Sequence, residues 1–140
     1  MVASLIAPVL ALILWTFVIW FWMYFTRIPA MRAAGIDPAK IKSKGELDPL
    51  PIKVKQIADN YNHLHEQPTV FYALAICSHL LSMLDPMTVG LVWAYVGLRV
   101  VHSLIQCTGN FVPLRFMVFA CSSVVLMIIA VRDVLALLAR

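Results

Sequence analysis

The sequence predicts an all-α fold, a four-helix transmembrane bundle, on two observations. Hydrophobic residues make up 62% of the 140 residues and charged residues only 13%, whereas soluble domains average about 45–50% and about 25%. Such a chain cannot cover its surface with polar groups in water, but a lipid bilayer removes that requirement. The apolar residues also gather into four runs, which predict a single integral-membrane domain over residues 1–140 with spans at about 5–26, 68–84, 88–107 and 113–138.

The first span carries no charged residue and ends in an aromatic cluster at residues 20–25. Aromatic side chains of this kind gather at membrane interfaces, and Arg27 would then lie among the headgroups. The run is too long for the core of a signal peptide, and no small-residue cleavage site follows it. We expect a retained transmembrane helix.

Residues 27–66 form a polar loop. Seven of the eleven Lys and Arg residues lie between Arg27 and Lys55, and helix-breaking residues recur at Pro38, Gly45, Pro49 and Pro51. The positive-inside rule places this loop in the cytoplasm and both termini on the opposite side of the membrane. We expect a bacterial inner membrane. The basic residues do not alternate with aromatic ones as in single-strand binders, so no nucleic-acid partner is expected.

Polar turns lead directly into the second span. On a helix, Asp59, Asn62 or His63, and Glu66 would share one face. Pro68 is expected to mark a kink or a restart of this helix. Further on, Asp85 and Pro86 form a tight turn, and Pro113 suits the first turn of the fourth helix.

A polar stripe runs along the third span, at Arg99, His102 or Ser103, Gln106 and Asn110. An arginine within a span costs roughly 2.5–3.5 kcal/mol on insertion scales, so it should face a polar partner.

Folding the second and third spans into a hairpin about the Asp85–Pro86 turn places Arg99 opposite Tyr72, and Gln106 opposite residues 57–66. Glu66 would lie about 9 Å closer to the cytoplasm than Arg99, within reach of an extended arginine. We predict a buried Glu66–Arg99 ion pair.

The sequence allows two interpretations of that pair. In the first, its role is structural and it only fixes the register of the helices, as polar residues do in coiled coils. Further polar residues in the cytoplasmic half of the bundle favour a binding site: His63, His102, Gln106 and Arg115. His79 lies deeper, and we expect a hydrogen-bonded interior histidine there.

Other cofactors find little support in the sequence. Four-helix membrane cytochromes hold haem between histidines on facing helices, but in the hairpin His79 and His102 fall at different depths. The isolated Cys77, Cys107 and Cys121 form no CxxC pair and are interpreted as small buried hydrophobes. No metal site is predicted.

The layout resembles the MAPEG superfamily, the membrane-associated proteins in eicosanoid and glutathione metabolism, over essentially the whole chain. Arg99-Val100-Val101-His102 is similar to the family's Arg-x-x-His on helix three, and Arg115 to the arginine that opens helix four. Glu66 is similar to the glutamate of the Arg-x-x-x-Asn-x-x-Glu segment. The resemblance implies a homotrimer that binds glutathione as cofactor between subunits, near the cytoplasmic face, with the helix-four arginine stabilising its thiolate.

The chain also departs from the family pattern. Asp59 stands at the arginine position and His63 at the asparagine position. Gln106 stands where many of the enzymes have tyrosine, and Phe119 where some have another tyrosine. An aspartate at the first position would repel a glutathione carboxylate instead of binding it.

The resemblance leaves two functions open. One is a glutathione-dependent transferase or peroxidase acting on small apolar electrophiles or lipid hydroperoxides. The other is a non-catalytic binding module or accessory subunit of a larger membrane complex. For the enzyme, Arg115 is the candidate catalytic residue, although it would also suit a headgroup anchor of helix four. The candidate glutathione-binding residues are Asn62, His63, Glu66, Arg99, His102 and Gln106.

Overall fold

The computed structural model describes residues 4–139, which are helical throughout apart from turns and one loop. The five α-helices are α1 (Ile6–Ala33), α2 (Ile52–His63), α3 (Gln67–Leu80), α4 (Pro86–Cys107) and α5 (Val112–Leu138). Two short 3₁₀ turns, Pro38–Lys40 and Lys44–Leu47, interrupt the loop between α1 and α2. The part of the chain that the structure describes contains no β-strand.

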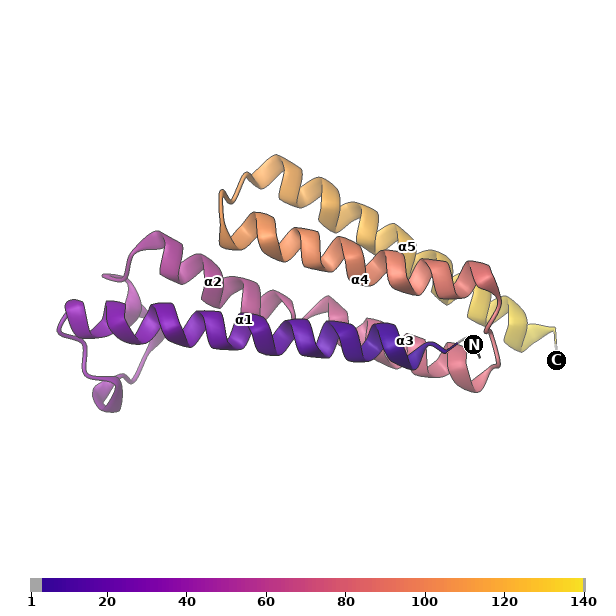
Figure 1. Ribbon diagram of the computed structural model, residues 1–140, viewed down its shortest axis with the longest axis horizontal. Helices are drawn as coiled ribbons and strands as arrows, with labels where there is room; N and C mark the ends of the chain where they lie inside the picture. Colours follow the sequence, from indigo (N-terminus) through magenta and orange to yellow (C-terminus); the bar gives the residue numbers. More distant parts are fainter. Residues whose placement is uncertain (1–3, 140) are drawn as a thin grey trace.

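The helices form a bundle in which α2 and α3 follow one another along α1 as one broken helix (Figure 1). α4 and α5 pack side by side as a hairpin against them. The α1–α2 loop and the α4–α5 turn lie toward one end of the bundle, and the α3–α4 turn lies at the other (Figure 1). Within residues 4–139, α1, α4 and α5 are long and apolar enough to cross a membrane. α3 has only 14 residues, about 21 Å of helix.

α1 continues to Ala33, beyond the predicted end of the first span at residue 26. It ends where Gly35 adopts a left-handed conformation, φ 69°, so that the Ile36 amide reaches the Met31 carbonyl at 3.0 Å. Glycine suits this position because it has no Cβ to clash there. The range predicted as a loop, 27–66, therefore contains helix at both of its ends.

α2 ends at His63, and α3 restarts at Gln67 after the turn Leu64–Glu66. Pro68 lies in the first turn of α3, where its missing N–H would have no helical partner anyway. The restart expected at Pro68 is therefore present. The expectation of one shared helical face for Asp59, His63 and Glu66 is wrong, because Glu66 lies outside α2.

The turn between α3 and α4 is centred on Ser82 and not on Asp85–Pro86 as the hairpin prediction assumed. Ser82 has φ 57°, and the Met83 amide donates to the Ser78 carbonyl at 2.9 Å. Asp85 instead caps α4, since its Oδ1 accepts from the amides of Met87 and Thr88 at 3.1 and 3.2 Å. This shift changes which residues of α3 and α4 face one another.

Aromatic and aliphatic side chains fill the interior of the bundle. Phe71 of α3 stacks on Tyr95 of α4 with ring centroids 4.4 Å apart, and Leu12 and Ile19 of α1 are fully buried. By contrast, large apolar side chains such as Phe25 of α1 and Met127 of α5 lie exposed. This distribution suits contact with lipid.

Candidate functional site

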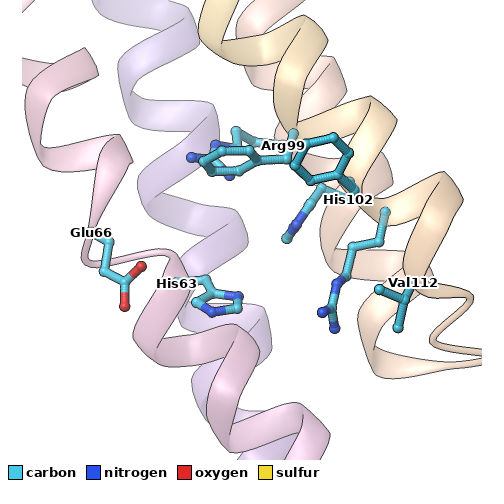
Figure 2. Close-up of a pocket in the computed structure, with 8 residues that line it drawn as sticks. His63, Glu66, Arg99, His102 and Val112 are labelled. Carbon is cyan, nitrogen blue, oxygen red and sulfur yellow. The ribbon is translucent and has the colours of Figure 1, made fainter.

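A cavity of about 260 Å³ lies between the α2–α3 turn and the α4–α5 hairpin. Figure 2 shows His63 and Glu66 on one wall and Arg99, His102 and Val112 on the other. The lining residues are His63, Glu66, Arg99, His102, Val112, Arg115, Phe116 and Phe119. The structure therefore brings five of the seven predicted site residues together.

Arg99 is 2% exposed and is held by neutral groups. Its Nη2 donates to Oε1 of Gln67 at 2.5 Å, and its Nε donates to the hydroxyl of Tyr95 at 3.1 Å. The guanidinium carbon also lies 5.2 Å from the centre of the Phe119 ring, close enough for a cation–π interaction. No carboxylate of residues 4–139 is within ion-pair distance of it.

The predicted Glu66–Arg99 ion pair is therefore wrong. Glu66 lies exposed in the turn before α3, and the turn at Ser82 places Gln67, the next residue, opposite Arg99. The hairpin prediction had placed Tyr72 there, more than one helical turn further along α3.

Gln67 is a site residue that the sequence reasoning missed. Its side chain joins three helices, since it accepts from Arg99 and Tyr95 of α4 and donates to Oγ of Ser123 of α5 at 2.8 Å. The signal for it in the sequence is a neutral amide at the entrance to an apolar run, directly after Glu66.

These contacts leave a positive charge at the cavity wall. Buried cations normally have an anionic partner, because neutral acceptors compensate only part of the lost hydration. In the described part of the chain Arg99 has only neutral partners, and Arg115 adds a second guanidinium to the same cavity. Among the residues that the structure describes, Glu66 is the single carboxylate that lines it. The cavity is therefore suited to an anionic ligand.

Arg115 is half-buried and fixed in place. Its Nη1 donates to Oδ1 of Asn110 at 2.5 Å. Asn110 lies in the α4–α5 turn with φ 48°, a conformation that asparagine tolerates better than most residues. The guanidinium is thus held at the cavity by its own helix-entry turn.

His63 and Gln106 form a second pair across α2 and α4. Nδ1 of His63 donates to Oε1 of Gln106 at 3.0 Å, which confirms the expectation that Gln106 faces residues 57–66. The ring of His63 also lies 6.1 Å from that of His102, measured between centroids. Gln106 itself is buried and does not line the cavity, so it acts on the cavity only by orienting His63.

Asn62 lies elsewhere than predicted. It lines a different, polar cavity together with Asp59 and Arg27, between α1 and α2. Asp59 therefore does not line the cavity that contains Arg99.

Two further expectations are wrong. Nδ1 of His79 is buried without any hydrogen-bond partner in residues 4–139, whereas a hydrogen-bonded histidine was expected. Cys107 is buried as expected, but Cys77 and Cys121 are exposed. Within the same residues, no group of three or more His, Cys, Asp or Glu side chains is arranged to hold a metal ion.

The family profile described as the MAPEG family matches residues 5–135. The chain belongs to the MAPEG family. It is accordingly a membrane protein of the superfamily associated with eicosanoid and glutathione metabolism. No curated protein and no solved structure matches the chain.

The residues that resemble the MAPEG pattern lie together in the cavity. The four residues that carried the resemblance, Glu66, Arg99, His102 and Arg115, all line this one cavity although they come from three separate parts of the chain. In this MAPEG protein, none of the side chains of residues 4–139 that line the cavity carries a hydroxyl group, and Phe119 presents a plain ring to Arg99.

Proposed function

We propose that this MAPEG protein binds glutathione in the Arg99–Arg115 cavity and is a glutathione-dependent transferase or peroxidase. The observation that supports the proposal is the buried Arg99, which has no carboxylate partner in residues 4–139 and faces a cavity with a second arginine. Glutathione carries two carboxylates, an ammonium group and a thiol. Guanidinium groups match the carboxylates and the thiolate, and Glu66 matches the ammonium group.

Arg115 is the proposed catalytic residue. A free thiol has a pKa of about 8.5, so only a few per cent is ionised at neutral pH. Each unit by which that pKa falls corresponds to about 1.4 kcal/mol of preference for the thiolate. A guanidinium that is half-buried and oriented by Asn110 supports such a shift far better than a solvated one. With no hydroxyl on the cavity wall, the arginine would carry this role.

The thiolate would attack an apolar electrophile at carbon, forming a C–S bond while the leaving group departs with its electron pair. With a lipid hydroperoxide it would attack the terminal oxygen and break the O–O bond, releasing the alcohol after proton uptake. A second glutathione would then convert the resulting sulfenic acid to the disulfide and water. Val112 and Phe116 at the cavity are 54% and 67% exposed, so small apolar substrates could enter from the lipid.

Two residue identities favour a second function. Gln106 occupies a position where many of the enzymes have tyrosine and Phe119 one where some do, and neither side chain offers a hydroxyl to a thiol. A non-catalytic MAPEG protein, serving as a binding module or as an accessory subunit of a larger membrane complex, would keep the fold without needing those hydroxyl groups.

The proposed assembly is a homotrimer in a bacterial inner membrane, with the basic α1–α2 loop in the cytoplasm. The exposed apolar faces of α1 and α5 support contact with lipid or with neighbouring copies. Cross-linking in native membranes tests the trimer, and finding only monomers over a range of protein concentrations would overturn it.

Calorimetry with glutathione and the ultraviolet absorbance of its thiolate distinguish the two functions. We expect millimolar or tighter binding, with a thiolate signal that Arg115→Ala abolishes and Arg115→Lys restores only in part, because a point charge lacks the planar fork. Arg32→Ala, which removes an exposed arginine that does not line the cavity, is the matched control and should change nothing. Absence of binding at millimolar glutathione would favour the non-catalytic function. A full thiolate signal in Arg115→Ala would contradict the catalytic role and leave Arg115 as a headgroup anchor of α5.

A further inference from the structure

A second candidate site lies along the seam between α1 and α2, away from the Arg99–Arg115 cavity. A polar cavity of about 510 Å³ is lined by charged side chains from the end of α1, the loop and α2. We call it the headgroup cavity; its charged lining residues are Arg27, Lys44, Asp48, Lys55 and Asp59. Next to it, an aromatic groove of about 180 Å³ lies between α1, the end of α2 and the start of α3, lined among others by Phe17, Trp20, Tyr61 and Tyr72.

The charges of the headgroup cavity are largely unpaired. Arg27 and Lys44 make no ion pair within residues 4–139, and Lys55 donates only to the backbone carbonyl of Asp48, at 3.1 Å. Asp59 likewise has no cationic partner in that part of the chain. Three cationic side chains and two carboxylates thus line one cavity, and they could pair with a ligand that carries both a positive and a negative charge.

The headgroup cavity and the aromatic groove are aligned along the helices. Trp20 and Arg27 are seven residues apart on α1, so they share a face and lie about 10 Å apart along its axis. On α2, Ala58 and Asn62 line the headgroup cavity while Tyr61 lines the groove, with His65 just beyond the end of that helix. One ligand running along the seam would pass from the polar space into the aromatic one.

The depth of this seam matches a membrane surface. A span of about 20 residues crosses the hydrocarbon core, and Arg27 lies about that far along α1 from Ile6. Arg27 and its cavity therefore fall at headgroup level, and the groove at Phe17 and Trp20 falls at the level of the first acyl carbons. Basic pockets at this level are where lipid headgroups bind.

We propose that the α1–α2 seam binds one glycerophospholipid whose headgroup carries a phosphate and a primary ammonium group, as in phosphatidylethanolamine. The phosphate lies against Arg27 and Lys44, the ammonium group donates to Asp59 or Asp48, and one acyl chain occupies the aromatic groove. The mixed charge of the cavity favours this headgroup over one with phosphate alone. This inference does not depend on glutathione binding, because none of these residues lines the Arg99–Arg115 cavity.

Fluorescence quenching by brominated lipids tests the proposal on the full-length protein in bilayers. A variant with Trp15→Phe, Trp22→Phe and Trp93→Phe leaves Trp20, in the groove, as the sole tryptophan. Quenching is compared for brominated phosphatidylethanolamine, phosphatidylglycerol and phosphatidylcholine at equal mole fractions. Mass spectrometry of lipid retained by the wild-type protein in detergent gives the same comparison without the tryptophan substitutions.

We expect phosphatidylethanolamine to bind in preference to both other lipids. Arg27→Gln with Lys44→Gln should reduce its binding by roughly fivefold per basic side chain removed. Asp59→Asn should reduce its advantage over phosphatidylcholine, whose ammonium group has no N–H to donate. Lys40→Gln with Lys42→Gln removes the same amount of charge from the nearby α1–α2 loop, at positions that do not line the cavity, and should leave the preference intact.

Three results would overturn the proposal. Equal quenching by all three lipids in the parent protein would show an ordinary lipid boundary. An equal loss in the Lys40 and Lys42 control would show a general effect of loop charge. Displacement of the bound lipid by millimolar phosphoethanolamine, with Tyr61→Ala having no effect on lipid binding, would identify the ligand as a soluble phosphate ester and not a lipid.

Discussion

Arg99 and Gln67 form the polar centre of the bundle, with Nη2 of the arginine 2.5 Å from Oε1 of the glutamine. The glutamine is neutral and does not compensate the charge of the guanidinium, so the cavity beside it has a positively charged wall. Because the same amide donates to Ser123 of α5, the charge, the cavity and the packing of three helices depend on one side chain.

Gln67→Ala should therefore destabilise the protein by about 2–4 kcal/mol, since it leaves a buried guanidinium N–H and the Tyr95 hydroxyl without their acceptor. Gln67→Glu retains an acceptor and should cost less. Denaturant unfolding in detergent measures both changes. Asn62→Ala, at an exposed position, is the control; a Gln67→Ala loss no larger than that of the control would contradict the assigned role.

Asn110 should govern the orientation of Arg115. Asn110→Gly keeps the left-handed backbone accessible but removes the oxygen that accepts from Arg115. Turnover in the proposed glutathione-dependent reaction should therefore fall about tenfold. Asn110→Asp retains an acceptor and should stay near wild type. Steady-state kcat/KM of the three proteins provides the measurement, and equal values for the glycine and aspartate variants would rule out a positioning role.

Ser78 and Asp133 form a buried link between α3 and α5, with Oγ 2.6 Å from Oδ2. Ser78→Ala should cost about 1–3 kcal/mol, because the carboxyl group then has no partner in residues 4–139. Ser78→Ala combined with Asp133→Leu should recover most of that loss, since both polar groups are gone. A double-mutant cycle on unfolding free energies tests this; simple additivity would mean that the two residues are not coupled.

The stability contributed by Asp85 should depend on pH. Hydrogen bonds from Thr88, above all from its hydroxyl at 2.7 Å, lower the pKa of the Asp85 carboxyl below its ordinary value, and Arg132 at 3.0 Å adds to this. A depressed folded-state pKa means that the stabilisation is present above the unfolded pKa, near 3.9, and is lost as the pH falls through the folded value.

The melting temperature of Asp85→Asn should thus lie below that of the wild type at pH 7, and the gap should close below about pH 4. Asp59→Asn removes an exposed carboxylate with no ion pair in residues 4–139 and should show no comparable gap. A gap for Asp85→Asn that is constant from pH 7 to pH 3 would contradict this account.

The long apolar helices were predictable because the thickness of a bilayer dictates their length. α1, α4 and α5 follow directly from runs of residues that only lipid would accept. Hydropathy indicates where a chain leaves the membrane and not where its helix ends. The continuation of α1 to Ala33 therefore could not be predicted from the apolar run. The break at Leu64–Glu66 was foreseen only through Pro68.

The candidate site was predictable in composition but not in pairing. Helical spacing and the MAPEG resemblance identified Arg99, His102 and Arg115, because an arginine in a span demands a polar neighbour. The choice of Gln67 over Glu66 depends on helix register, which the turn at Ser82 sets. Serine rarely adopts a positive φ, so nothing in the local sequence indicated that the chain would turn there.

The shortness of α3 gives the cavity an unusual relation to bilayer thickness. Its 14 residues fall about 9 Å short of a hydrocarbon core of about 30 Å, whereas α1 and α5, with 28 and 27 residues, exceed it. Hydrophobic mismatch of this kind can thin the bilayer locally, and we expect the thinning beside Gln67 and Arg99. Water and headgroups would then reach closer to the buried guanidinium, so that a polar ligand would not have to cross the full thickness of the hydrocarbon. On this account, lipids with shorter chains should ease access to the cavity and lipids with longer chains should hinder it.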